Sequence, residues 1–430
     1  MLSWIQTNRL LVAAIGMAML ASIGAMAFLL LLRIPDHPYQ LGAAIGLFIE
    51  AILETGSYEV VRDDRSWVAS KMPVLPLLYA ALWQITGSIT AMTILKNVIF
   101  VGLLLMFLLR YGRVMGADRR VLALSVAVMF CIPVNAFVMM GLSYEEAILF
   151  ALVPIAIGLT IIARRPADMW ILALLVAAMY LTKSSVLVFC AWLAVLALLN
   201  LPKADLGISR AAPAVALLAA MLAWGGFTYV QTGHFAFGSG ASSNNGMNLF
   251  KGNNPQVADI YPWGHLDILN PELRDGAPDF TDEWEENAWF ADRATAYMRE
   301  NPDEVLQNGL LKLRVLFIHV ADFDFNRNRL VKILVHDVGM VVNRIVQWVA
   351  LIAAAAWLLR RGDGQGWRDP RRYAGLVFLG AFAAYALPYL VGFLYIRHVV
   401  PLFISAFLIV MLLPWPFRAR TGLPQSNAAQ

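Results

Sequence analysis

Of the 430 residues, 60% are hydrophobic and only 14% are charged, and the formal net charge is +4. Soluble domains carry about 25% charged residues, so this composition excludes an ordinary soluble protein and indicates a chain that crosses a membrane several times. The two cysteines, Cys131 and Cys190, lie in apolar runs and are expected to be small core residues, since nothing supports a disulfide or a metal site there.

Apolar runs of about 20 residues, the length that crosses a bilayer as a helix, recur along the chain. The first, residues 10–32, is too long for a signal-peptide core, and we interpret it as a retained span. A longer run, residues 169–199, is interrupted at Lys183. Because a lysine at the centre of one span is costly, we expect two short helices that meet there. The other spans are expected at residues 91–110, 121–140, 144–163, 211–230, 338–359, 373–394 and 398–416.

The basic residues set the expected topology, because loops rich in Lys and Arg stay on the cytoplasmic side. All basic loops fall on that side if residues 72–88 do not fully cross and residues 169–199 cross twice. This predicts ten spans, both termini in the cytoplasm, and a short helix over 72–88 at the outer surface. A rival interpretation makes 72–88 an eleventh span and inverts most later loops. The basic loops lie at residues 110–120, 164–165, 203–210, 360–372 and 418–420.

Three regions follow from this topology. An N-terminal transmembrane module, residues 1–231, contains a polar first external loop, residues 33–90. Next comes an external loop domain, residues 232–337, and then the C-terminal spans and tail, residues 338–430. The segment 231–337 has nine basic and sixteen acidic residues, a net charge of −7. Its apolar periodicity predicts two helices, 285–298 and 305–320, on either side of Pro302.

Charged residues from distant parts of the sequence are expected at one membrane face. Carboxylates there suit proton abstraction from an acceptor, and cations at the bilayer edge suit a phosphate on a lipid whose tail stays in the membrane. The sequence therefore predicts a site for a phosphate-carrying lipid. The residues expected at this face are Asp36, Arg62, Arg65, Lys71, Glu145, Glu146, Lys183, Arg397 and His398.

Several short motifs, taken in order, resemble the GT-C glycosyltransferases, especially the family-39-like branch of protein O-mannosyltransferases and lipid A aminoarabinose transferases. An aspartate, Asp36, follows the first span, with Tyr39 shortly after it. The other matching elements are Gly-Ser-Tyr at 56–58, Lys-Met-Pro at 71–73, Leu-Thr-Lys at 181–183, Gly-Asn-Asn-Pro at 252–255, the proline-interrupted helical run 297–313, and the arginine-containing start of the last span at 395–401.

The resemblance implies an all-α polytopic GT-C fold with about ten transmembrane helices, external juxtamembrane helices and a mixed external loop domain. It implies an inverting enzyme of the inner (plasma) membrane whose site faces the periplasm. The donor would be a polyprenyl-phosphate-linked sugar and the acceptor a lipid, a glycan or a protein; no nucleic acid is expected. Asp36 would be the general base. His37 and Pro38 stand where the family often has a second acid, which leaves Asp63 and Asp64 as alternative bases.

The remaining roles are assigned on the same resemblance. Glu145 joins Asp36 as a catalytic carboxylate, although an acid at a helix start is also favoured by the helix dipole. Asparagines are most often turn formers, so two of the expected sugar contacts have that alternative. No ligand spacing demands a metal, so no cofactor is expected, and a need for a divalent metal stays open. The donor phosphate is assigned to Lys183, Arg397, Lys71 and Arg65, and acceptor or sugar contacts to Tyr39, Tyr58, Asn253, Asn254 and Tyr261.

Two other functions compete with this interpretation. An O-antigen polymerase or ligase also has many spans and a large external loop, but it uses a lipid diphosphate donor. A lipid-carrier flippase or transporter usually shows internal repeats and charges at mid-membrane. No repeat is found here, and the polar residues are expected at one face.

Overall fold

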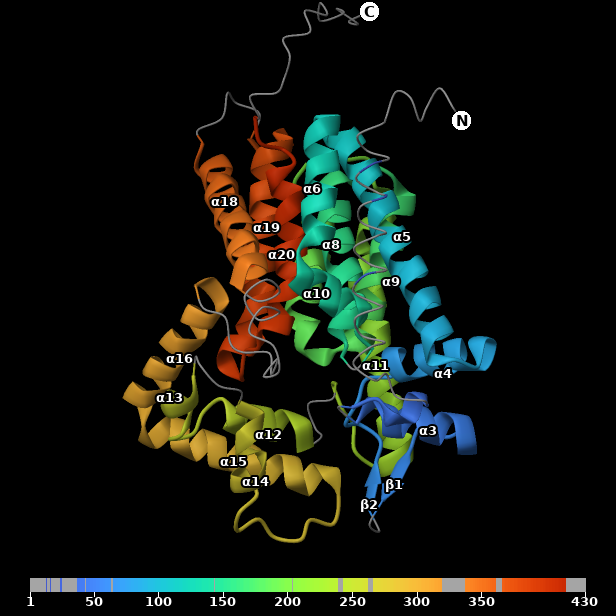
Figure 1. The fold of residues 1–430 in the computed structure, drawn as a ribbon, viewed down its shortest axis with the longest axis vertical. Helices are drawn as coiled ribbons and strands as arrows, with labels where there is room; N and C mark the ends of the chain where they lie inside the picture. Colours follow the sequence, from blue (N-terminus) through green and yellow to red (C-terminus); the bar gives the residue numbers. More distant parts are fainter. Residues whose placement is uncertain are drawn as a thin grey trace, which may run out of the picture.

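The computed structural model describes residues 13, 16, 24, 37–42, 44–62, 65–142, 144–202, 204–238, 243–261, 266–318, 337–360 and 366–414. In these ranges the chain is almost entirely helical, and one two-stranded antiparallel sheet is present. A long helical bundle carries a smaller group of helices at one end (Figure 1). The expected helical architecture is confirmed at this level.

Four of the described helices are long and apolar enough to cross a membrane, judged by length and composition. They are α5 (Ile89–Met115), α11 (Ala212–Thr232), α18 (Gly339–Leu359) and α19 (Pro370–Val391). Five further apolar helices are shorter, so the expected ten spans are not shown. The first expected span, residues 10–32, lies outside the described ranges except at positions 13, 16 and 24. The shorter helices are α4 (Val74–Thr86), α8 (Glu146–Ile162), α9 (Pro166–Thr182), α10 (Leu187–Leu199, which follows the 3-10 turn η2, Ser184–Val186) and α20 (Ile396–Val410).

Helix α8 is the centre of the bundle. All of its residues are buried, and it packs against α5, α9, α19 and α20. A helix that is apolar on every side is stable in such a central position, where other helices cover all of its surface. Its first residue, Glu146, is the one charged residue in the helix, and its burial therefore needs partners.

Two interruptions shape the bundle. The predicted break at Lys183 is confirmed, because α9 ends at Thr182 and η2 begins at Ser184. The expected single span over 121–140 is instead two helices, α6 (Arg119–Cys131) and α7 (Pro133–Met140). Proline lacks the N–H that would continue α6, and it disfavours helical geometry at the preceding Ile132.

The short helix predicted over 72–88 is confirmed as α4; the side of the membrane on which it lies stays a prediction. Its 13 residues span roughly 20 Å, less than a bilayer core, and Figure 1 shows it lying across the direction of the bundle. Before it come η1 (Pro38–Gln40), α3 (Ile45–Thr55) and a hairpin of β1 (Val60–Arg62) and β2 (Arg65–Trp67), which the sequence did not predict.

A group of helices closes one end of the bundle (Figure 1); we call it the α12–α16 cap. The two helices predicted around Pro302 are confirmed as α15 (Glu283–Glu300) and α16 (Pro302–Phe317). Helix α12 was not expected from its Gly, Ser and Asn content, and it packs on α15 through Gly246, where a Cβ would meet the Asn287 carbonyl oxygen at 2.1 Å. The cap also holds α12 (Ser243–Lys251), α13 (Val257–Ile260), η5 (Leu266–Leu269) and α14 (Asn270–Leu273).

Candidate functional site

Charged side chains meet where the helix ends of the bundle face the cap. Lys183 lies at the break after α9, and its Nζ is 2.5 Å from Glu146 Oε1 and 3.8 Å from Glu145 Oε2. Lys71, just before α4, places its Nζ 3.4 Å from the other Glu145 oxygen, Oε1. Four residues from three distant parts of the sequence thus form one connected set of ion pairs. Together with Arg397 and His398 at the start of α20, we call them the cation–carboxylate cluster.

The two carboxylates of the cluster are largely buried among cations. The Glu146 side chain is 1% exposed and the Glu145 side chain 15% exposed. Burial alone would raise the pKa of Glu145, but the Lys71, Lys183 and Arg397 cations outweigh it and lower the pKa to about 2. For Lys183, burial works against the charge, and the nearby Glu146 and Glu145 carboxylates nevertheless raise the pKa above its ordinary value. Glu145 and Lys183 are therefore both charged at neutral pH.

His398 joins the cluster through Tyr389. The two rings are stacked with centroids 4.4 Å apart, and Lys183 Nζ lies 5.3 Å from the Tyr389 ring centre. His398 Nδ1 accepts a hydrogen bond from the Tyr395 backbone N–H at 3.2 Å. The neutral imidazole therefore carries its proton on Nε2, which lies 3.8 Å from Glu146 Oε1.

Arg397 is the cation of the cluster that makes no ion pair with a carboxylate of the described residues. Its guanidinium lies over the Tyr144 and Tyr395 rings, 4.0 and 4.6 Å from their centroids. Its Nε is buried and has no hydrogen-bond partner in the described part of the chain, and no carboxylate there lies within ion-pair distance of it. Two aromatic rings thus hold the guanidinium while donor groups remain available, an arrangement that suits an anion.

Some of the expected site residues cannot be placed in this geometry. Asp36, Asp63 and Asp64 lie outside the described residues, as does the side chain of Tyr39 in η1. Arg65 starts β2 and pairs in register with Arg62 at the closed end of the hairpin. The structure describes no ion pair or hydrogen bond between the Arg65 side chain and the cluster.

The three cap residues that were expected to contact sugar form hydrogen bonds with backbone carbonyl groups. Asn253 Nδ2 donates to the Leu249 and Val391 carbonyls, each at 2.8 Å. Asn254 Nδ2 donates to the carbonyls of residues 250 and 251, and the Tyr261 hydroxyl donates to the Leu394 carbonyl at 2.5 Å. All three side chains are at least 98% buried, so they organise the chain around the cluster and present little surface to a sugar.

The Gly-Asn-Asn-Pro motif docks on the segment that precedes Arg397. A Cβ at Gly252 would meet the Gly392 carbonyl oxygen at 1.9 Å, so only glycine permits this approach. Tyr58 has a similar role on the other side, where its hydroxyl donates to the Lys71 carbonyl at 3.1 Å. These motifs therefore support the two segments that carry cluster cations.

Three participants were not assigned from the sequence as site residues. Glu146 and His398 were expected at the membrane face, but neither was given a role there. Tyr389 gave no signal beyond its place near the end of an apolar run, where tyrosines are common. The break at Lys183 was the available clue, because a buried cation requires a carboxylate nearby.

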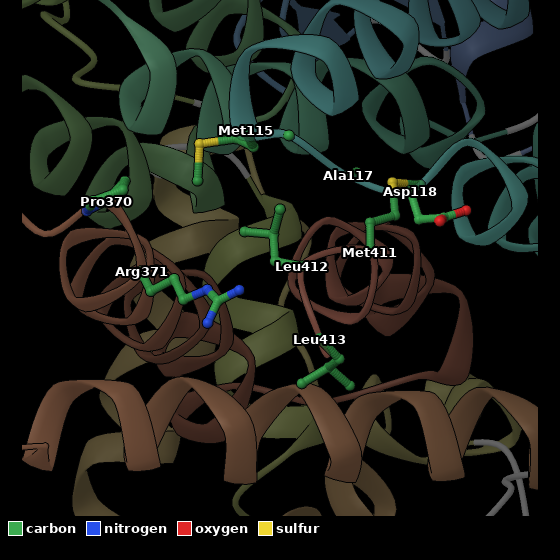
Figure 2. Close-up of a pocket in the computed structure, with 9 residues that line it drawn as sticks. Met115, Ala117, Asp118, Pro370, Arg371, Met411, Leu412 and Leu413 are labelled. Carbon is green, nitrogen blue, oxygen red and sulfur yellow. The ribbon is translucent and has the colours of Figure 1, made fainter. Parts of the chain in front are cut away.

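Metal ligation and the pocket in Figure 2 were considered as alternatives to the cluster. No group of three or more His, Cys, Asp or Glu side chains among the described residues could hold a metal ion. Figure 2 shows a small pocket at the far end of α20, which starts at the cluster and runs roughly 20 Å away from it over 15 residues. Its lining residues are Met115, Gly116, Ala117, Asp118, Pro370, Arg371, Met411, Leu412 and Leu413.

Comparisons with known proteins leave the family open. No family model and no curated protein matches the chain. Among solved structures, it is similar to the archaeal oligosaccharyltransferase AglB from Archaeoglobus fulgidus, in complex with an inhibitory peptide and a dolichol-phosphate. The TM-score is 0.44 and the identity 11%, over 95% of this chain and 50% of that chain. This chain thus spans half the length of that protein, and at this TM-score the likeness carries no argument about its fold or function.

Proposed function

We propose that this chain is an integral membrane glycosyltransferase of GT-C type. It moves a sugar from a polyprenyl-phosphate carrier to an acceptor on the extracytoplasmic face. The observation that carries the proposal is the cation–carboxylate cluster, in which Lys71, Lys183 and Arg397 meet two carboxylates at the ends of apolar helices. Such a place lets a lipid keep its chain among apolar helices while its phosphate meets fixed cations.

The cations stabilise the leaving group. As the acceptor oxygen forms its bond to the anomeric carbon, the bond from that carbon to the phosphate oxygen breaks, and the electron pair stays on the phosphate. Charge that develops on the departing oxygen is best met by donors already in place. Arg397 supplies its guanidinium, whose Nε has no hydrogen-bond partner in the described part of the chain, and Lys183 and Lys71 supply ammonium groups. One direct displacement inverts the anomeric carbon.

Asp36 is the proposed base that removes the acceptor proton. Glu145 suits this role less well, because an efficient base has a pKa near the working pH and the neighbouring cations lower the pKa of Glu145 to about 2. We therefore assign Glu145 and Glu146 to holding Lys71 and Lys183 in place.

The test uses purified protein in liposomes with a panel of polyprenyl-phosphate-linked sugars. Release of free polyprenyl phosphate is expected with the wild type and is expected to be lost in Asp36→Asn. The matched control is Glu54→Gln, an exposed acid in α3, which should behave as the wild type does. Near-normal turnover by Asp36→Asn would remove Asp36 as the base. No release with any monophosphate donor, followed by release from diphosphate-linked glycans, would replace the proposal with the ligase alternative.

A further inference from the structure

The segment that presents Arg397 and His398 is held by the cap. It comprises the last residues of α19 and the link to α20, and we call it the connector (residues 390–395). In α16, Lys312 Nζ donates to the carbonyls of Leu390 and Val391 at 3.1 and 3.3 Å. The Asn253 amide and the Tyr261 hydroxyl bind the same connector, as described above. The start of α20 is thereby fixed to the cap at several points.

Burying the amine of Lys312 costs free energy that a purely structural contact would not require. Its side chain is 1% exposed, burial lowers its pKa to about 7, and no carboxylate in the described part of the chain pairs with it. An apolar side chain would fill this volume without burying an amine. What the lysine adds is a donor to two carbonyls at the C-terminal end of α19, where helix carbonyls have no partner in the helix and the dipole is negative.

The cap also holds the segment that carries Lys71. Glu283, the first residue of α15, accepts hydrogen bonds through Oε1 from the backbone N–H groups of Val68 and Ala69 at 2.9 and 2.8 Å. Asn301 is the one residue between α15 and α16, so Glu283 and Lys312 belong to one helical arm. A single body therefore contacts the backbone on both sides of the proposed phosphate site.

We infer that Lys312 and Glu283 are positioning residues, which act through the connector and through residues 68–69 to set the spacing between Arg397 and Lys71. This inference rests on the proposed function. The two cations reach the cluster from segments joined to different helices, α20 and α4. Their common contact with the cap fixes both in register for one phosphate. If the cap no longer contacts one of these segments, both cations are still present, but their spacing no longer fits one phosphate.

The experiment measures binding of polyprenyl phosphate to the full-length protein in detergent micelles, followed by intrinsic tryptophan fluorescence. Lys312→Met keeps the size of the side chain and removes the donors, and the dissociation constant is expected to rise about tenfold, the lower end of what losing an outer-shell partner costs at metal sites. Lys312→Arg restores donors to the carbonyls and is expected to recover most of the affinity. Gln307→Met, exposed on the same helix, is the control and should bind as the wild type does.

The outcomes separate the inference from the function on which it rests. Unchanged affinity in Lys312→Met, with wild-type binding intact, overturns the positioning role alone. No binding by the wild type overturns both proposals. A lower melting temperature with unchanged affinity assigns Lys312 to structure and also overturns the inference. Should Lys312→Met fail to fold, Glu283→Met tests the same arm, because it removes the oxygen that accepts from the Val68 and Ala69 N–H groups. A dissociation constant equal to that of the wild type then counts against the inference.

Discussion

Glu146 shows how single residues determine this site. It is nearly inaccessible, and its closest partner is Lys183, at the break between two helices. A carboxylate in such a place is stable only while its cation remains, because removing one member of a buried pair leaves an uncompensated charge. Stability and the proposed binding of phosphate therefore involve the same lysine, and the two effects have to be separated by experiment.

A double-mutant cycle on this pair makes that separation. Lys183→Met is expected to destabilise the protein by about 3–5 kcal/mol, because the Glu146 carboxylate stays buried without the cation that is closest to it. Adding Glu146→Gln removes the charge and is expected to recover most of that stability without restoring transfer. Thermal unfolding in detergent and release of polyprenyl phosphate are measured on all four proteins. A double variant that regains transfer as well as stability would show that Lys183 has no role at the phosphate.

At the scale of elements, the motif around Gly252 joins the cap to the bundle. Gly252→Ala places a methyl group against the backbone of Gly392, which cannot rotate away as a side chain can. The connector is expected to shift, which costs about 1–3 kcal/mol and lowers the affinity for polyprenyl phosphate. Gly309→Ala in α16 is the control: nothing lies within 4 Å of its Cβ position, so it should stabilise the protein by about 0.5–1 kcal/mol. Equal melting temperatures for the two variants would contradict the close approach.

The same scale shows what the sequence could predict. The break at Lys183 and the helices around Pro302 follow from local rules, since a charge or a proline interrupts an apolar helix wherever it occurs. That charges would gather at helix ends followed from their spacing along the chain. The function of Asn253 and Tyr261 could not be read in this way, because their partners lie in a connector more than one hundred residues later. Glu283 likewise gave no signal, because its partners are two backbone N–H groups in the first loop.

The two ends of the helical bundle carry different groups of residues. The cluster and the cap lie at one end of the bundle, and the loop between α5 and α6 lies at the other (Figure 1). Arg119 follows this loop as the first residue of α6. Helix α5 alone, with 27 residues, separates them by roughly 40 Å, enough to cross a bilayer core. A membrane around the bundle would place these two ends in different compartments. The positive-inside rule predicts that the end with Arg119 faces the cytoplasm.

Cysteine labelling tests this orientation. In a background with Cys131→Ser and Cys190→Ala, single cysteines replace Asp279 in the cap and Arg119 at the start of α6, both of which are exposed. A membrane-impermeant maleimide is expected to label the cap cysteine in intact cells and the cysteine at position 119 only after permeabilisation. The reverse pattern would mean that the bundle is inserted in the opposite orientation, with the cap and the cluster in the cytoplasm. Labelling of both in intact cells would contradict a bundle that crosses the membrane between the cap and α6, and the donor lipid would then have to reach the cluster by another route.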